Sequence, residues 1–112
     1  MGMFSRVRRS RPGLVRTAQG SDTDHLRQWA QAHQGVEAFV EPKTTVTETT
    51  VVLVAVDGEW TRRRIDGPDG ARKLAKSLKI PVYDVQIVGY PQRMRDYDAR
   101  RRGKRDRRGD LM

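Results

Sequence analysis

The sequence predicts a small α+β domain in which two helices pack on a mainly antiparallel sheet, in the order α-β-β-β-α-β. Three observations lead to this fold class. The chain has 112 residues, which suits one small domain. Its central part switches between stretches with helical periodicity and stretches with strand periodicity. Its excess positive charge lies in the two ends, so the part between them is nearly neutral.

The first predicted element is a helix over residues 22–34. Its apolar positions recur at the spacing of one helix face, and they are Leu26, Trp29, Ala30 and His33. Ser21 or Thr23 can cap its start, and Gly35 supplies a stop. We expect His33 to lie at the edge of the buried face and to do no chemistry.

Three strands are expected after this helix. Residues 36–41 show the period-two alternation of a strand. Residues 44–56 are rich in Thr and Val, the β-branched types that suit a pleated surface. The continuous apolar run at their end indicates a central strand that is covered on both faces. Residues 59–65 should return as the hairpin partner of this strand.

The turn between the last two of these strands decides which way Trp60 points. Asp57-Gly58 is a strong hairpin signal, because a tight turn needs positive φ. A two-residue turn would pair Ala55 with Trp60 and leave Trp60 at least partly exposed, on the face away from the main core. A bulged turn would shift the register by one residue and bury Trp60.

A second helix and a last strand complete the predicted domain. Asp66 can cap the helix, Pro68 is tolerated in its first turn, and Pro81 prevents its continuation. Its buried stripe consists of Ala71, Leu74, Ala75 and Leu78. Residues 82–88 then indicate a strand that ends at Gly89.

The charge distribution divides the chain into three parts. Residues 1–20 hold five arginines and no acid, residues 92–112 hold nine bases and four acids, and residues 21–91 carry one net negative charge. The prediction is a flexible basic arm over 1–20, an α+β domain over 21–91 and a basic, largely disordered tail over 92–112. The formal net charge of +9 favours association with polyanions.

Arginine-rich segments with a nearby tryptophan are the candidate nucleic-acid contacts. Guanidinium groups bind phosphate oxygens in a bidentate manner, and a base can stack on an exposed indole. On a strand, Trp60, Arg62 and Arg64 point the same way. The other candidates lie in the arm, on the second helix and in the tail, and they are Arg6, Arg8, Arg9, Arg11, Arg72, Lys73, Lys76, Arg100, Arg101, Arg102, Lys104, Arg105, Arg107 and Arg108. The alternatives are a Trp60 in the core, solvated charges on strand and helix, and a tail that only solubilises the chain.

Several function classes lack the residues that they need. The absence of cysteine excludes a thiolate nucleophile, a cysteine zinc site and an iron–sulfur cluster. No glycine-rich phosphate-binding motif is present. We therefore expect no catalytic residues, no metal and no cofactor. No apolar stretch is long enough to span a bilayer, and no signal peptide is recognisable, so we expect a cytoplasmic protein without a membrane partner.

Two resemblances add to this description. The segments EPKTTVTETT (41–50), GEWTRR (58–63) and PVYDVQ (81–86) resemble those of small bacterial proteins of unassigned function from high-GC genomes. Some of these proteins are labelled oxidoreductases, but no residue here supports a redox reaction. The resemblance implies a bacterial, cytoplasmic origin.

The second resemblance is one of topology. The α-β-β-β-α order and the segment GARKLAK (70–76) resemble the double-stranded-RNA-binding domain. That domain normally ends with this helix, whereas residues 82–88 here continue the chain as a further strand.

The favoured function is that of a non-catalytic, nucleic-acid-associated accessory protein. RNA or the ribosome is the expected partner, DNA is possible, and the basic ends supply the phosphate contacts. The alternative is a protein-interaction adaptor whose domain docks a partner or a second copy while its tails only solubilise it.

Overall fold

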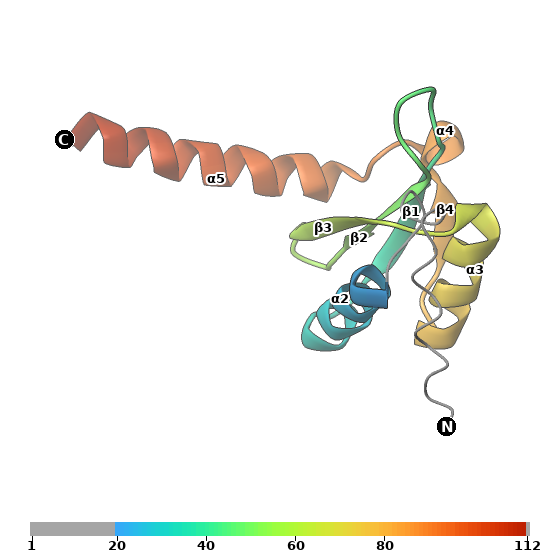
Figure 1. Cartoon of the computed structure of the whole chain (residues 1–112). Coiled ribbons are helices and arrows are strands. Elements are labelled where there is room, and N and C mark those ends of the chain that lie inside the picture. The colour runs from blue at the N-terminus through green and yellow to red at the C-terminus, as the bar shows by residue number, and fades with distance from the viewer. Residues whose placement is uncertain (1–19, 112) are drawn as a thin grey trace.

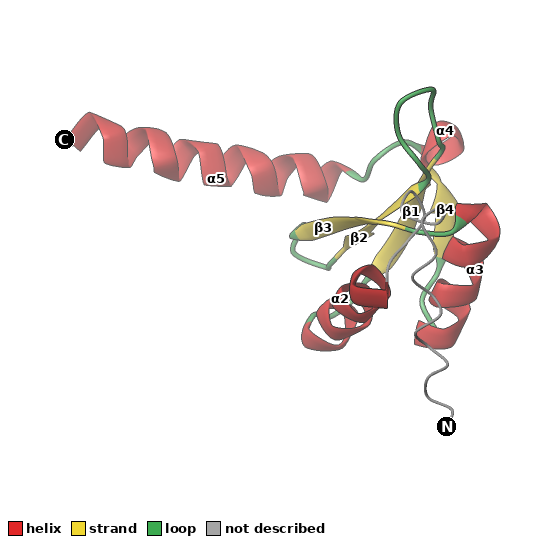
Figure 2. Ribbon diagram, viewed as in Figure 1, coloured by secondary structure: helices red, strands yellow, loops and turns green. Residues whose placement is uncertain are grey.

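The computed structural model describes the backbone of residues 20–111 and the side chains of residues 20–104. It confirms the predicted α+β class and the α-β-β-β-α-β order up to residue 84. A four-stranded sheet of order β3-β2-β1-β4 carries helices on both faces (Figures 1 and 2). The elements are α2 (Gly20–Ala32), β1 (Glu37–Glu41), β2 (Thr50–Val54), β3 (Trp60–Arg64), α3 (Gly67–Leu78), β4 (Val82–Asp84), α4 (Val85–Val88) and α5 (Gln92–Leu111).

The sheet is mainly antiparallel, as expected. β2 pairs antiparallel with both β1 and β3, while β4 joins the free edge of β1 in parallel. A parallel neighbour needs a crossover, and α3 provides it. The central position of β2 explains its apolar sequence, because four of its five residues are buried between helices on both faces.

The main core lies between the sheet and the two helices α2 and α3. Side chains from all three layers meet there, and the buried ones are Leu26, Val36, Ala38, Val40, Val51, Leu53, Ala55, Ile65, Ala71, Leu74 and Ala75. The predicted helix faces are correct: Leu26 is fully buried, and Trp29 and Ala30 pack beside it. α3 ends at Lys79, whose φ of 59° belongs to the left-handed conformation of a helix C-terminus.

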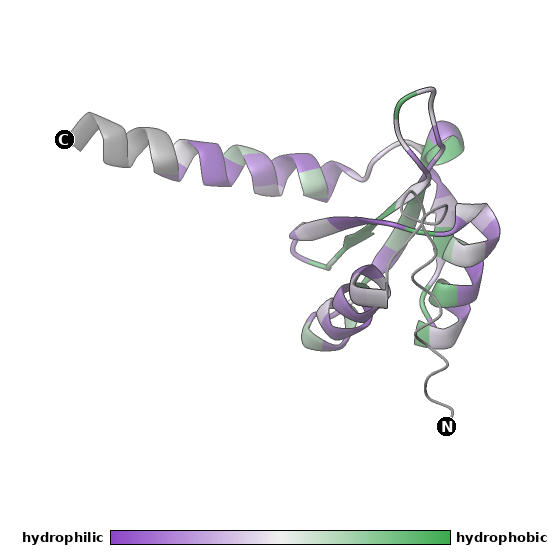
Figure 3. Cartoon of the chain, in the orientation of Figure 1, coloured by the Kyte–Doolittle hydropathy of each residue, from purple (hydrophilic) through white to green (hydrophobic). Residues whose placement is uncertain are grey.

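A smaller core lies on the opposite face of the sheet. Phe39, Val52 and Val54 are buried under Met94 of α5, with Trp60 and Tyr90 packed at the margin. Because neighbouring residues on a strand point to opposite faces, β2 divides its side chains between this core and the main one. Figure 3 shows the contrast between the hydrophobic strand β2 and the largely hydrophilic residues in the first part of α5.

The predicted two-residue hairpin turn is wrong by one residue. Trp60 pairs with Val54 rather than with Ala55. The Ala55 amide bonds to the Glu59 carbonyl and the Gly58 amide to the Ala55 carbonyl, which closes a three-residue loop with Gly58 at a φ of 95°. This is a turn followed by a glycine bulge. The extra residue turns Trp60 onto the face with Val52 and Val54.

The expected strand over residues 82–88 is correct only for its first half. β4 stops at Asp84, and residues 85–88 form the short helix α4. The Asp84 carboxylate accepts a hydrogen bond of 2.8 Å from the Gln86 amide, which caps this turn. The local cap outweighs the apolar, β-branched composition of these residues.

The domain does not end at the predicted boundary, residue 91, because Met94 packs into the smaller core. Residues 92–111 form α5, and its first two turns pack on the sheet. The apolar side chain of Met94, only 7% exposed, provides the contact that a purely charged tail would lack. The predicted arm over 1–20 lies outside the described residues except for Gly20. Within residues 20–111, no helix is long and apolar enough to cross a membrane.

Candidate nucleic-acid interface

The first two turns of α5 are fixed to the sheet by a mixture of apolar and polar contacts. Met94 fills the smaller core, and the indole Nε1–H of Trp60 donates a hydrogen bond of 2.9 Å to Asp98. Two residues further along the helix, Arg100 donates to the Asp57 carbonyl at 3.0 Å. α5 therefore crosses β3 beside the hairpin before it leaves the domain.

Arg93 anchors the start of α5 at the other side of this contact. Its Nε–H donates to the Ala55 carbonyl at 2.9 Å, and a terminal nitrogen pairs with Glu37 at 2.7 Å. The Arg93 guanidinium group thus donates to backbone carbonyls at the end of β2, where pairing with a neighbouring strand stops. Gly58 is required opposite it, because a Cβ atom there would lie 2.0 Å from the Arg93 carbonyl oxygen.

The outer part of α5 carries the exposed positive charge. Figure 1 shows this part extending away from the domain, beyond the β2–β3 hairpin. Its described basic side chains are all exposed, and they are Arg100, Arg101, Arg102 and Lys104. Arg100 and Arg101 lie over the ring of Tyr97, with centroid distances of 5.8 and 5.7 Å. The sequence prediction named all four as phosphate contacts, and the structure places them together on one helix.

The expected stacking surface on β3 is built differently from the prediction. Trp60 is only partly buried, but Arg62 lies over its ring at 5.2 Å from the centroid. Arg62 is in turn held by Glu41 through two hydrogen bonds of 2.7 and 2.9 Å. The Trp60 face that a base would need is thus covered by a paired guanidinium group.

Glu41 is the centre of this polar cluster. It accepts hydrogen bonds from Arg62, from the Tyr90 hydroxyl and from Thr50. Burial alone would raise the pKa of Glu41, but the hydrogen bonds from Arg62, Tyr90 and Thr50 outweigh burial and lower it. Burial and the same hydrogen bond to Glu41 raise the pKa of Tyr90. At neutral pH the Glu41 carboxylate is ionised and accepts hydrogen bonds from the Arg62 guanidinium group and the protonated Tyr90 phenol. These groups therefore hold one another in place.

The remaining β3 arginines lie beside the polar cluster. Arg63 points to the α2 side, where its guanidinium group is 3.6 Å from Asp22. Arg64 is exposed and lines a hollow with Thr47 and Thr50. Because side chains alternate along β3, Arg64 lies on the same sheet face as Trp60, which is the face that α5 covers.

The basic residues of α3 form a separate surface. Arg72, Lys73, Lys76 and Lys79 are exposed, and Arg72 pairs with Asp69 one turn earlier. α3 covers the sheet face that holds the main core, whereas α5 covers the other face. The two basic helices are thus not brought together on one surface.

Other predicted contacts lie where side chains are not described. Arg6, Arg8, Arg9 and Arg11 fall outside the described residues, and Arg105, Arg107 and Arg108 lie in α5 beyond the last described side chain.

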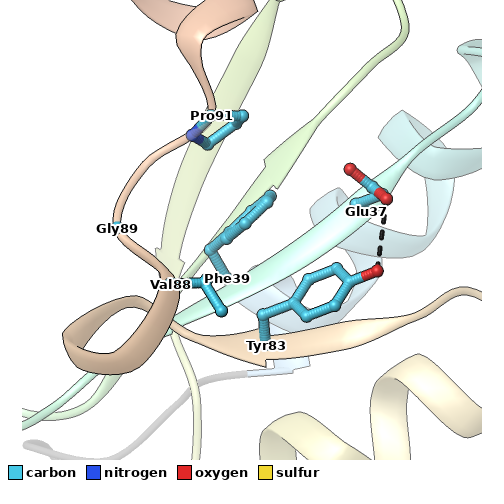
Figure 4. Close-up of a pocket in the computed structure, with 6 residues that line it drawn as sticks. All are labelled: Glu37, Phe39, Tyr83, Val88, Gly89 and Pro91. Atoms are coloured by element: carbon cyan, nitrogen blue, oxygen red, sulfur yellow. Dashed lines mark hydrogen bonds between the residues drawn. The ribbon is translucent and has the colours of Figure 1, made fainter.

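A second feature of the surface is apolar. Phe39 and Tyr83 point into a hollow of about 280 Å³ that Val88, Gly89 and Pro91 close on one side (Figure 4). Their rings lie 5.4 Å apart, and the Tyr83 hydroxyl points toward Glu37. Near its rim, Ile87 is 82% exposed and Val88 is 54% exposed.

No candidate metal centre was found among the described side chains. They contain no group of three His, Asp or Glu residues that could hold a metal ion. His25 bonds to the Thr61 hydroxyl at 2.7 Å, and burial together with Arg63 lowers its pKa. His33 stacks on Trp29 with a centroid distance of 3.7 Å and lies 3.3 Å from Glu59. Both histidines have structural partners.

Comparisons with family models, curated proteins and solved structures gave no match. Both resemblances found in the sequence therefore stay predictions.

Sequence reasoning missed the residues that hold α5 in place. The sequence pattern places Arg93, Met94 and Asp98 in a basic, largely disordered tail and gives Glu37 no role beyond its place in a strand. The signal for Met94 is present in the sequence, because it is the one aliphatic side chain within the charged stretch of residues 92–98. The partners of Arg93 and Asp98 lie 56 and 38 residues away in sequence, so no local pattern identifies them.

Proposed function

We propose that this protein is a non-catalytic, nucleic-acid-associated accessory protein whose α5 helix supplies the principal phosphate contacts, with RNA or the ribosome as the favoured partner. The observation that carries the proposal is the run Arg100, Arg101, Arg102 and Lys104, exposed on a helix that extends away from the domain. Guanidinium groups on a projecting helix can reach phosphate oxygens without moving the domain.

The proposal depends on which arginines are already paired with carboxylates as well as on how many there are. Arg62 and Arg93 are engaged with Glu41 and Glu37. Arg100 and Arg101, by contrast, contact an aromatic ring, and Arg100 also contacts a backbone carbonyl. Neither kind of contact neutralises a guanidinium charge, so the charge remains available for phosphate.

Two charge-matched variants test the proposal. The first replaces Arg100, Arg101, Arg102 and Lys104 with glutamine, and the second replaces Arg72, Lys73, Lys76 and Lys79. Each removes four positive charges from exposed positions on or directly after one helix, so both reach the same net charge. Fluorescence anisotropy with a labelled RNA stem-loop and a labelled DNA duplex reports affinity.

The α5 variant should bind at least about tenfold more weakly than the α3 variant, because each lost phosphate contact removes counterion release. Equal losses in the two variants would show that net charge alone governs binding. Unchanged affinity in the α5 variant would contradict the proposal.

The apolar hollow supports a second candidate, a protein-interaction adaptor. In a chain with many charged residues, exposed Ile87 and Val88 beside an aromatic hollow favour an apolar segment of a partner protein. The chain has no cysteine, so Ile87→Cys creates a unique attachment point for a photo-crosslinker. Val46→Cys is the matched control, because Val46 is 87% exposed on a loop. Crosslinking to one protein from position 87 and not from 46 would favour the adaptor; equal labelling from both would count against it.

A further inference from the structure

The two halves of α5 receive different support from the rest of the domain. Met94, Asp98 and Arg93 fix the first half to the sheet. Among residues 101–104, the last ones whose side chains are described, three are basic, and Arg101 lies over Tyr97 of α5 itself. The first turn is the costly step in forming a helix, and the docked half has already formed it.

The outer half is a weak helix on its own. Lys104 lies three residues after Arg101 and four residues after Arg100, and like charges at these helical spacings repel each other. Gly103 lies among them and disfavours the helix further, because it loses the most backbone entropy on ordering. Phosphate groups would remove the repulsion, so an anionic ligand stabilises the helical form.

The directions of these side chains indicate the shape of the ligand. At 100° per residue, three consecutive arginines cover more than half of the helix circumference, and Lys104 lies between the first two. A flat phosphate surface would use one side of such a helix. A groove with phosphates along both walls would use all of them.

Stacking of single-stranded bases has less support in the structure. Trp60 is covered by Arg62, and Tyr97 lies beneath Arg100 and Arg101. Binding of single strands generally uses free aromatic faces.

We infer that the outer half of α5 binds as a helix in the open groove of a double-stranded nucleic acid, nucleated by the half that is docked on the sheet. This inference rests on the proposed function and specifies its ligand. An α-helix with side chains is about 10–12 Å across, and the B-DNA major groove is about 12 Å wide. The regular A-form major groove is too narrow, so an RNA ligand would need a groove widened by a bulge.

Gly103 offers a test that leaves every charge in place. A Cβ atom at Gly103 would meet open space, so Gly103→Ala is tolerated and favours the helix. Gly103→Pro breaks the helix at the same position. Both variants should keep the thermal unfolding of the domain, because Gly103 lies beyond the docked contacts.

The probes are a B-form DNA duplex, a bulged RNA stem, a regular RNA duplex and a single strand, all of equal length. For the DNA duplex and the bulged stem, Gly103→Pro should weaken binding by about 30- to 100-fold, while Gly103→Ala should bind as tightly as the wild type or up to about fivefold more tightly. The regular RNA duplex and the single strand should bind more weakly and respond little to either substitution.

Two results would overturn the inference: equal affinity of both Gly103 variants for the DNA duplex, or tightest binding to the single strand. In either case salt-dependent binding by the wild-type chain would leave the proposed function standing. Absence of binding to all four probes by the wild-type chain would instead overturn the proposed function itself.

Discussion

The indole nitrogen of Trp60 and the carboxylate of Asp98 lie 2.9 Å apart, which joins the edge strand β3 to the helix α5. A hydrogen bond to a charged acceptor is stronger than a neutral one. Together with Met94 it fixes the direction in which the basic end of α5 leaves the domain. Trp60 thus acts as an anchor for α5 and offers little surface to a stacked base.

Substitution of Trp60 should therefore cost stability. Trp60→Ala removes part of the smaller core and the hydrogen bond to Asp98, with an expected loss of about 2–3 kcal/mol. Trp60→Phe keeps an aromatic ring and should lose less, about 1–2 kcal/mol, because it removes the donor and only part of the ring volume. Urea unfolding followed by circular dichroism measures both. Losses below about 0.5 kcal/mol in both variants would show that the contact with α5 is not formed in solution.

Gly58→Ala should be strongly destabilising. The residue has a φ of 95°, and a Cβ atom would lie 2.0 Å from the Arg93 carbonyl oxygen, so the hairpin or the start of α5 must move. We expect a loss of about 3 kcal/mol or more.

Gly67→Ala is the matched control for this substitution. Gly67 also has positive φ, at 70°, but its Cβ direction is open. It should lose only the conformational cost, about 1–2 kcal/mol. Equal losses at the two glycines would refute the close approach of α5 to the hairpin.

The Glu41 cluster should make stability depend on pH in the acidic range. The pKa of Glu41 is lower in the folded state, because hydrogen bonds from Arg62, Tyr90 and Thr50 outweigh its burial. Its contribution is therefore complete above the unfolded pKa of about 4.3 and is lost as the pH falls through the folded value.

Glu41→Gln measures this contribution. The difference in unfolding free energy between wild type and variant should be constant from about pH 7 to 5.5 and should shrink below about pH 4.3. A difference that persists unchanged to about pH 3 would mean that the carboxylate is not held by this cluster.

The elements that the sequence predicts well are those with strong local signals. The period of Leu26, Trp29 and Ala30 identifies α2, and the run from Val51 to Val54 identifies the central strand. Both patterns follow directly from burial on one or two sides of an element. The buried stripes predicted for α2 and α3 are confirmed for this reason, but the main core lies on the β2 face of Val51 and Leu53, where the predicted two-residue turn would have placed Trp60.

The errors share a physical cause, which is a single local contact that outweighs composition. A glycine bulge at Gly58 shifts the register and turns Trp60 to the other face. The Asp84 cap converts an apolar, β-branched segment into α4. Met94 packs against the sheet and thereby holds the charged start of α5 on it. The contacts of the candidate interface were harder to predict still, because α5 is positioned by partners that are distant in sequence.

The most direct test of the account is the salt dependence of binding to a DNA duplex, measured for the wild type and the two charge-matched helix variants. Each phosphate contact contributes about −0.9 to the slope of log K against log salt concentration. Loss of Arg100, Arg101, Arg102 and Lys104 should flatten the slope by about 3 to 4, whereas loss of the four α3 bases should change it by less than about 1. An α5 variant that keeps the wild-type slope would contradict the assignment of phosphate binding to α5.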